Sequence, residues 1–150
     1  MATVSLDLPN HPLAAGLCRS AVNTVGKTLS GEDAVLLGLL TNELVTNSIV
    51  HAPDSPRVLV ALMLLDDRVR VEVTDQVDGR PPTLEPLSLN RTSGRGLYLV
   101  DELSDDWGVD QSDGTRVWFE LLLRAPVDVV LSSRKNDPGG HDLRTEARSL

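Results

Sequence analysis

Apolar and polar residues follow a clear period over the first part of the chain. Residues 4–8 alternate between apolar and polar types, which predicts a short strand. A helix is predicted next, with Asn10 as its cap and Pro12 in its first turn. The apolar positions that recur there at helical spacing, and that we expect to face the core, are Leu13, Leu17, Ala21, Val22 and Val25.

A second helix is predicted to begin at Ser30, because a serine followed by acidic residues favours the start of a helix. It runs to about His51 and is stopped by the sequence Ala-Pro-Asp-Ser-Pro at residues 52–56. Apolar residues occupy nearly every side of this helix, which is typical of a helix buried in a protein core.

The next part of the chain predicts a hairpin, a loop, a short helix and two strands. Residues 58–65 and 69–74 are strand-like runs on either side of two aspartates. Residues 77–93 have no period and hold several prolines, so we expect a long loop, of the kind that often forms a functional lid. A helix at 97–103 and strands at 107–109 and 116–123 follow. This order predicts an α/β (α+β) two-layer sandwich, with an antiparallel or mixed sheet and helices on one face.

Length and composition narrow the class of protein. The 150 residues suit one domain, which we expect to span 1–125, and the polar residues 126–150 predict a mobile tail. The formal net charge of −8 argues against a surface for duplex DNA or an anionic membrane. The single cysteine, Cys18, excludes an internal disulfide and reads as a small buried core residue. We find no secretory signal, and the apolar runs 34–40 and 58–65 are far shorter than the roughly 20 residues of a membrane span, so a cytoplasmic protein is expected.

The second helix carries the first candidate site. Glu43 and Asn47 are four residues apart and therefore lie on one face of the helix. Buried side chains of these types need partners, and a hydrated metal ion or a water to be activated would be suitable ones. The alternative is a narrow solvated seam shared with Asn42 and Thr46. His51, one turn further on, is most simply a histidine favoured by the negative end of the helix.

A second candidate follows the predicted hairpin, where Asp75 closes a strand and Gly79 lies in the turn after it. An ionised carboxylate accepts hydrogen bonds from an exocyclic amine, which adenine carries and guanine lacks at the same ring position. The alternative is an ordinary aspartate at the end of a strand.

The sequence Ser-Gly-Arg-Gly-Leu at residues 93–97 stands directly before a predicted helix. Glycines let backbone amides approach a phosphate, and the helix N-terminus adds partial positive charge. Arg95, with Arg91 nearby, could pair with phosphate oxygens. A plain tight turn is the alternative, and Gly114-Thr115 at the start of the last strand is uninformative by itself.

Together these four stretches resemble the signature of the GHKL (Bergerat-fold) ATPase and kinase superfamily, over roughly residues 5–123. The sequence Glu-Leu-Val-Thr-Asn-Ser-Ile-Val-His-Ala at 43–52 is similar to the N-box. Residues 75–79 resemble the first glycine box, 94–97 the second, and 114–115 the last. The nearest likeness is to the short anti-sigma-factor serine kinases, in which the histidine-kinase-like ATP-binding domain stands alone.

The resemblance implies a role for each position. Glu43 is expected to be the general base, and Asn47 to bind Mg²⁺ that bridges the ATP phosphates. Asp75 is expected to accept from the adenine amine, with Thr115 supporting the base. Residues 77–93 would form the ATP lid. The other nucleotide-binding positions implied by the resemblance are Gly79, Arg91, Gly94, Arg95, Gly96 and Leu97.

One position departs from the family pattern: Val77 stands where the first glycine of the Asp-x-Gly-x-Gly box is usual. The leading hypothesis is an ATP-dependent serine kinase that binds a sigma factor and phosphorylates an anti-sigma-factor antagonist, with a homodimer suggested by kinship. The alternative is a nucleotide-gated regulatory protein that sequesters a partner without phosphoryl transfer. A third hypothesis is a scaffold that has lost ATP binding.

Overall fold

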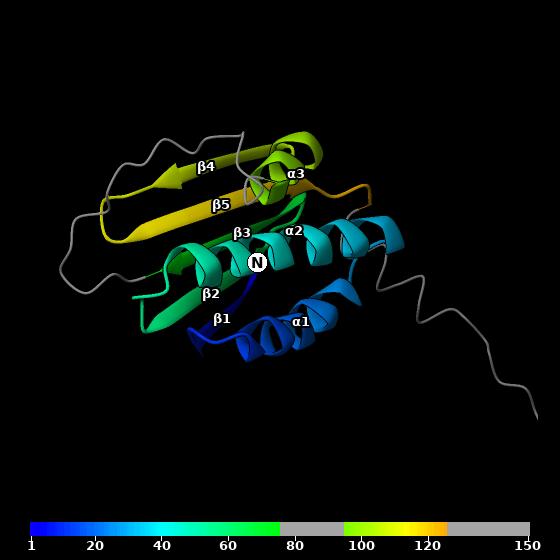
Figure 1. The fold of residues 1–150 in the computed structure, drawn as a ribbon. Helices are drawn as coiled ribbons and strands as arrows, with labels where there is room; N and C mark the ends of the chain where they lie inside the picture. The colour runs from blue at the N-terminus through cyan, green and yellow to red at the C-terminus, as the bar shows by residue number, and fades with distance from the viewer. Residues whose placement is uncertain (76–94, 126–150) are drawn as a thin grey trace, which may run out of the picture.

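The computed structural model describes residues 1–75 and 95–125, in which three helices lie against one sheet (Figure 1). The predicted lid at 77–93 and the predicted tail at 126–150 lie outside these residues. The helices are α1 (Leu13–Gly26), α2 (Gly31–His51) and α3 (Arg95–Leu103). The strands are β1 (Ala2–Pro9), β2 (Arg57–Leu64), β3 (Arg68–Asp75), β4 (Asp106–Asp110) and β5 (Thr115–Leu122).

The sheet has the strand order β1-β2-β3-β5-β4, and each neighbouring pair is antiparallel. All three described helices cover the same face of the sheet, with α2 running between α1 and α3 (Figure 1). The predicted two-layer α/β sandwich is therefore confirmed, and among the described strands the sheet is antiparallel rather than mixed.

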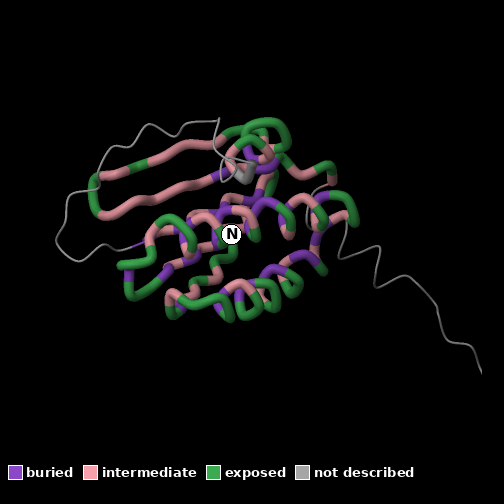
Figure 2. Tube along the Cα trace, in the orientation of Figure 1, coloured by how far each residue is buried: buried purple, intermediate pink, exposed green. Residues whose placement is uncertain are grey.

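The core lies between the sheet and the helices and follows from the alternation of each strand. On β3, for example, Val69, Val71 and Val73 are buried while the residues between them are half-buried. Figure 2 shows the helices changing between buried and exposed positions in each turn. The core is built mainly from leucine and valine, with Phe119 as the one buried phenylalanine. Scarce aromatic residues are thus compensated by many medium-sized side chains.

The structure corrects the predicted buried face of α1. Leu13 and Leu17, expected in the core, are 71% and 55% exposed. The buried stripe instead consists of small side chains, namely Ala14, Cys18, Val22 and Gly26. Small residues bring α1 close to α2: a Cβ atom on Gly26 would lie 3.3 Å from the Cβ of Ala34. Cys18 is buried as expected, and burial raises the pKa of its thiol to about 11.

Asn10 does not cap α1, contrary to the sequence-based expectation. Pro12 is the residue at the helix boundary, and it makes no side-chain cap. The Asn10 amide nitrogen instead donates to the carbonyl oxygens of Ala52 at 2.6 Å and Ser55 at 2.7 Å. Asn10 therefore ties the end of β1 to the loop that follows α2.

The predicted start of α2 is confirmed. Ser30 accepts a hydrogen bond from the Asp33 backbone amide at 3.2 Å, and its hydroxyl donates to the Asp33 carboxylate at 2.6 Å. The backbone amide of Arg124 also donates to Asp33, at 3.2 Å. Asp33 is only 3% exposed, so this carboxylate joins the start of α2 to the end of the last strand.

The composition of α2 suggested a helix buried on every side, but the structure shows that only one side is buried. Leu37, Leu40 and Leu44 are buried, whereas Val35 and Val50 are 69% and 60% exposed. By length and hydropathy alone this 21-residue helix could span a membrane. The sequence-based prediction did not indicate this, because it considered only uninterrupted apolar runs, which are shorter. Here its buried leucines pack on the sheet, as in an amphipathic core helix.

The opposite face of the sheet carries a ladder of charged side chains around Trp118. The Arg70 guanidinium lies 3.9 Å from the centre of the Trp118 ring and donates to Glu120 and Glu72, each at 2.9 Å. Gly108 of β4 lies opposite Trp118 in the register. A Cβ atom on Gly108 would lie 2.8 Å from the ring, so glycine is required for this packing.

We therefore expect Gly108→Ala to lower the free energy of unfolding by about 1–3 kcal/mol, because the ring must shift against its arginine. Gly16→Ala is the matched control, since a Cβ atom there meets no heavy atom within 4 Å and the position is an exposed turn of α1. That control should raise stability by roughly 0.5–1 kcal/mol through helix propensity. Urea unfolding measures both; equal stability of the two variants would contradict the packing argument.

Candidate functional site

Three elements meet at the end of the sheet where β3 stops: the second half of α2, the end of β3 and the start of β5. Asp75 is the last residue of β3, and its Cα partners are Val58 on β2 and Thr115 on β5. In Figure 1 the end of β3, the start of β5 and the end of α2 all lie on the left of the view. The fold therefore brings Asp75 and Thr115, predicted from separate motifs, into adjacent positions.

Asp75 is a buried carboxylate rather than an ordinary turn residue. It is 8% exposed, and its Oδ2 accepts a hydrogen bond from the Ser48 hydroxyl at 2.7 Å. Burial raises the pKa of Asp75, while hydrogen bonds from Ser48 and from the backbone of Asp75 and Thr115 act in the lowering direction. A carboxylate accepts about four hydrogen bonds, so it retains capacity for an incoming amine.

Glu43 and Asn47 occupy one flank of α2 and are both half-buried. At 100° per residue they lie across the helix from Val45, which faces α1. In Figure 1, α1 and α3 lie on opposite sides of α2, so the side of α2 away from α1 is the one next to α3. Both side chains are thus partly accessible, and the neighbouring Asn42 and Thr46 are exposed, as a solvated seam would also have them.

The residues predicted to contact phosphate are only partly described. Arg95 and Gly96 begin α3, and Leu97 is half-buried in its first turn, packed against the core. Gly79, Arg91 and Gly94 lie outside the described residues. α2 and α3 are in contact, so the N-terminal end of α3 belongs to the layer that also holds Asn47. The role of this segment stays a prediction.

The turn before Thr115 explains the neighbouring glycine. Gly114 has a φ angle of 80°, a conformation that residues with a Cβ atom rarely adopt. Gly114 therefore has a structural role: it allows the chain to reverse between β4 and β5, so that Thr115 lies opposite Asp75. Thr115 is half-buried there.

Ser48 is the residue of this site that the sequence reasoning missed. It follows Leu37, Leu40 and Leu44 at helical spacing on the buried stripe of α2, and it is 6% exposed. A polar residue in an otherwise apolar buried stripe is the signal that could have revealed it, because a buried hydroxyl needs a partner.

Asn47, next to Ser48 on α2, is the residue of this site that the sequence predicts to bind a metal ion. Among the described residues, no group of three or more histidine, cysteine or carboxylate side chains is arranged to hold a metal. Mg²⁺ commonly keeps several waters and takes one or two protein oxygens together with substrate phosphates. The half-buried amide of Asn47 fits that requirement.

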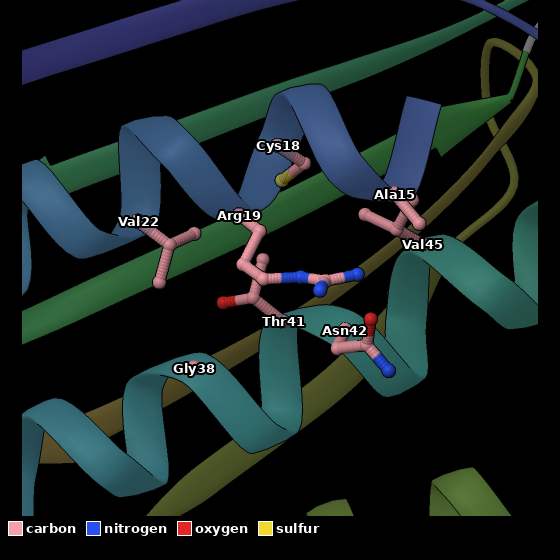
Figure 3. A pocket seen from close by; sticks show the side chains of 8 residues that line it. All are labelled: Ala15, Cys18, Arg19, Val22, Gly38, Thr41, Asn42 and Val45. Carbon is pink, nitrogen blue, oxygen red and sulfur yellow. The ribbon is translucent and has the colours of Figure 1, made fainter. Parts of the chain in front are cut away.

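A small cavity lies on the other flank of α2, between α1 and α2 (Figure 3). Its volume of about 20 Å³ is close to what one water molecule needs, far below that of a nucleotide. The buried Thr41 hydroxyl lines it and has no hydrogen-bond partner among the described residues. The cavity is therefore suited to a single bridging water and is separate from the Asp75 site.

Comparisons with known proteins agree with the motifs. Residues 8–121 match the family described as histidine kinase-like ATPase domain. The chain is similar to the serine-protein kinase RsbW of Listeria monocytogenes, with 25% identity over 130 residues that cover 76% of this chain and 83% of that protein. It is 26% identical over 130 residues to the serine-protein kinase RsbW of Bacillus velezensis, covering 76% of this chain and 81% of that one.

Among solved structures, the histidine kinase domain of a blue-light activated histidine kinase from Erythrobacter litoralis is similar, with a TM-score of 0.49 and 21% identity. The match covers 82% of this chain and 65% of that chain.

Proposed function

This chain belongs to the family of histidine kinase-like ATPase domains, and on that premise we propose that it is an ATP-dependent protein serine kinase that acts as an anti-sigma factor. The observation that supports this best is the buried Asp75 carboxylate, held by Ser48 at the end of β3 beside the flank of α2 that carries Glu43 and Asn47. The residues that we propose as adenine acceptor, magnesium ligand and base are therefore carried by two elements, α2 and β3, which the Ser48–Asp75 hydrogen bond joins.

In the proposed mechanism each side chain has one task. Asp75 accepts a hydrogen bond from the adenine amine, and Thr115 supports the base from the adjacent strand. Asn47 would hold a magnesium ion, whose positive charge would offset the negative charge of the phosphates when it is bound. Glu43, one turn earlier on α2, accepts the proton of the attacking serine hydroxyl. In phosphoryl transfer most acceleration comes from positioning and charge stabilisation, so this base needs correct placement above all.

The partners we propose are a sigma factor and an anti-sigma-factor antagonist, the latter being phosphorylated on serine. The similarity to two serine-protein kinases at 25–26% identity supports this assignment. We further propose that the protein acts in the cytoplasm as a homodimer. The exposed side chains of Leu13 and Leu17 on α1 are apolar surface that such an assembly could bury.

Binding of ATP with Mg²⁺ tests the proposal. At about 100 times its dissociation constant a ligand adds roughly 2.7 kcal/mol to stability, a shift that thermal unfolding detects readily. For Asn47→Ala we expect the ATP-induced shift to be small and the same with and without Mg²⁺. Asn42→Ala is the matched control, because this amide is exposed on the same helix; it should behave as the wild type. A wild-type shift that does not depend on Mg²⁺ would contradict the role given to Asn47.

The alternative function is a nucleotide-gated protein that sequesters its partner without phosphoryl transfer, and Val77 in the first glycine box favours it. The two functions differ in one measurement, transfer of label from γ-labelled ATP to a serine of the proposed antagonist protein. Tight Mg²⁺-dependent ATP binding without any transfer would support the alternative.

A further inference from the structure

Ser48 makes a contact that neither the family match nor the motifs assign. Its hydroxyl is 2.7 Å from Asp75 Oδ2 and is the donor, because an ionised carboxylate can only accept. Both side chains are almost fully buried, Ser48 at 6% and Asp75 at 8% exposed. The bond crosses from the helix layer to the sheet and joins α2 to the last residue of β3.

This contact fixes the carboxylate in place. A free aspartate side chain at the end of a strand can rotate about two bonds, whereas Asp75 is held on Oδ2 by Ser48 while its backbone is held between β2 and β5. One oxygen is therefore committed to α2. The acceptor capacity that remains has a defined direction relative to Asn47, the residue next to Ser48 on the same helix.

The contact also acts on the balance between the two chemical forms of Asp75. Burial favours the neutral carboxyl, and donation from a hydroxyl favours the charged carboxylate. The two forms read different purines. A carboxylate accepts from the amine of adenine, whereas a protonated carboxyl carries an O–H group that can donate to the carbonyl oxygen at the same position of guanine.

We infer that Ser48 is a positioning residue for purine selection, which holds Asp75 as an oriented, charged acceptor and so makes the site choose adenine over guanine nucleotides. This inference rests on the proposed nucleotide site. It assigns the selection not to Asp75 alone but to the Ser48–Asp75 pair, in which the serine does not itself contact the nucleotide.

The experiment compares the wild type with Ser48→Ala and Ser48→Thr, using calorimetric titration with Mg²⁺-ATP and Mg²⁺-GTP between pH 5 and 8. Ser48→Ala should weaken ATP binding at neutral pH by about tenfold, because Asp75 would then be in the oriented, charged form only part of the time and the apparent affinity falls with that fraction. GTP binding should fall less, so the ratio of the two affinities should decrease. The loss of ATP affinity on acidification should also begin at a higher pH in Ser48→Ala than in the wild type.

Ser48→Thr keeps the hydroxyl and should restore both the affinity ratio and the pH profile toward those of the wild type. A second readout does not need a nucleotide: the carboxyl carbon of Asp75, followed by NMR, should titrate at a higher pH in Ser48→Ala. A purely structural role for Ser48 would change ATP and GTP affinity equally and leave both pH profiles in place.

The outcomes separate the two proposals. Normal ATP binding by the wild type, with an unchanged purine ratio and unchanged Asp75 titration in Ser48→Ala, overturns the role of Ser48 and leaves the proposed function standing. Failure of the wild type to bind ATP at millimolar concentration overturns the proposed function and the inference together.

Discussion

Glu43→Gln is expected to reduce phosphoryl transfer to the antagonist serine by at least about 100-fold while leaving ATP affinity nearly unchanged. General-base catalysis typically contributes about 10²–10⁴-fold, and glutamine keeps the size and polarity of the side chain but cannot accept the proton. Glu43 is half-buried on the flank of α2 shared with Asn47, so an isosteric change should not disturb the core. Transfer of label from γ-labelled ATP, measured in a single turnover, reports the chemical step.

Glu102→Gln is the matched control for that experiment. Glu102 is an exposed carboxylate near the end of α3, so the same chemical change there should alter neither transfer nor binding. Transfer by Glu43→Gln at the wild-type rate would remove Glu43 from the mechanism. A parallel loss of ATP affinity in Glu43→Gln would instead indicate a role in binding.

Regular elements of this fold could be predicted because their signals are local. β1 follows from alternation of apolar and polar residues, and β2 and β3 follow from runs rich in β-branched residues. The start of α2 follows from Ser30 and the acidic residues after it. These features depend on residues only a few positions apart. The observed strand bounds differ from the predicted ones by one or two residues. The last strand, for example, was predicted to end at residue 123 and ends at Leu122.

The packing of α1 could not be predicted from its period alone. Helical spacing was read from the large residues Leu13 and Leu17, but the helix packs through a stripe of small ones that permits the contact between Gly26 and Ala34. Which of the two stripes is buried depends on how closely α2 approaches α1, and that distance is set by tertiary packing. Asn10 illustrates the same limit, because its acceptors at Ala52 and Ser55 are 42 and 45 residues away.

The candidate site was predictable in its parts but not in its assembly. Asp75 and Thr115 were each found from a short motif, and only the pairing of β3 with β5 brings them together. Ser48 lies 27 residues before Asp75, so the sequence holds no local sign of their hydrogen bond. Long-range contacts of this kind are where a functional site acquires properties that its motifs do not contain.

Asp75→Asn is expected to remove the ATP-induced rise in stability, which for the wild type is roughly 2.7 kcal/mol at 100 times the dissociation constant. The charged acceptor for the adenine amine is lost, and an amide in its place presents a donor as well as an acceptor. Thermal unfolding with and without Mg²⁺-ATP measures the effect. Asp113→Asn, an exposed aspartate in the turn before β5, is the control and should retain the full shift.

The same substitution should make the nucleotide-free protein more stable at neutral pH. Burial raises the pKa of Asp75 above its value in the unfolded chain, so the folded state binds this proton more tightly. The stabilising contribution of that proton is complete below the unfolded pKa of about 3.9 and is lost as the pH rises through the folded pKa. Urea unfolding should therefore show the wild type losing stability relative to Asp75→Asn as the pH rises across this window. Above the window the asparagine variant should have the larger free energy of unfolding. A wild type that gains on Asp75→Asn as the pH rises would mean that the hydrogen bonds from Ser48 and the backbone outweigh burial, and that the carboxylate is a structural acceptor whose charge the fold itself requires.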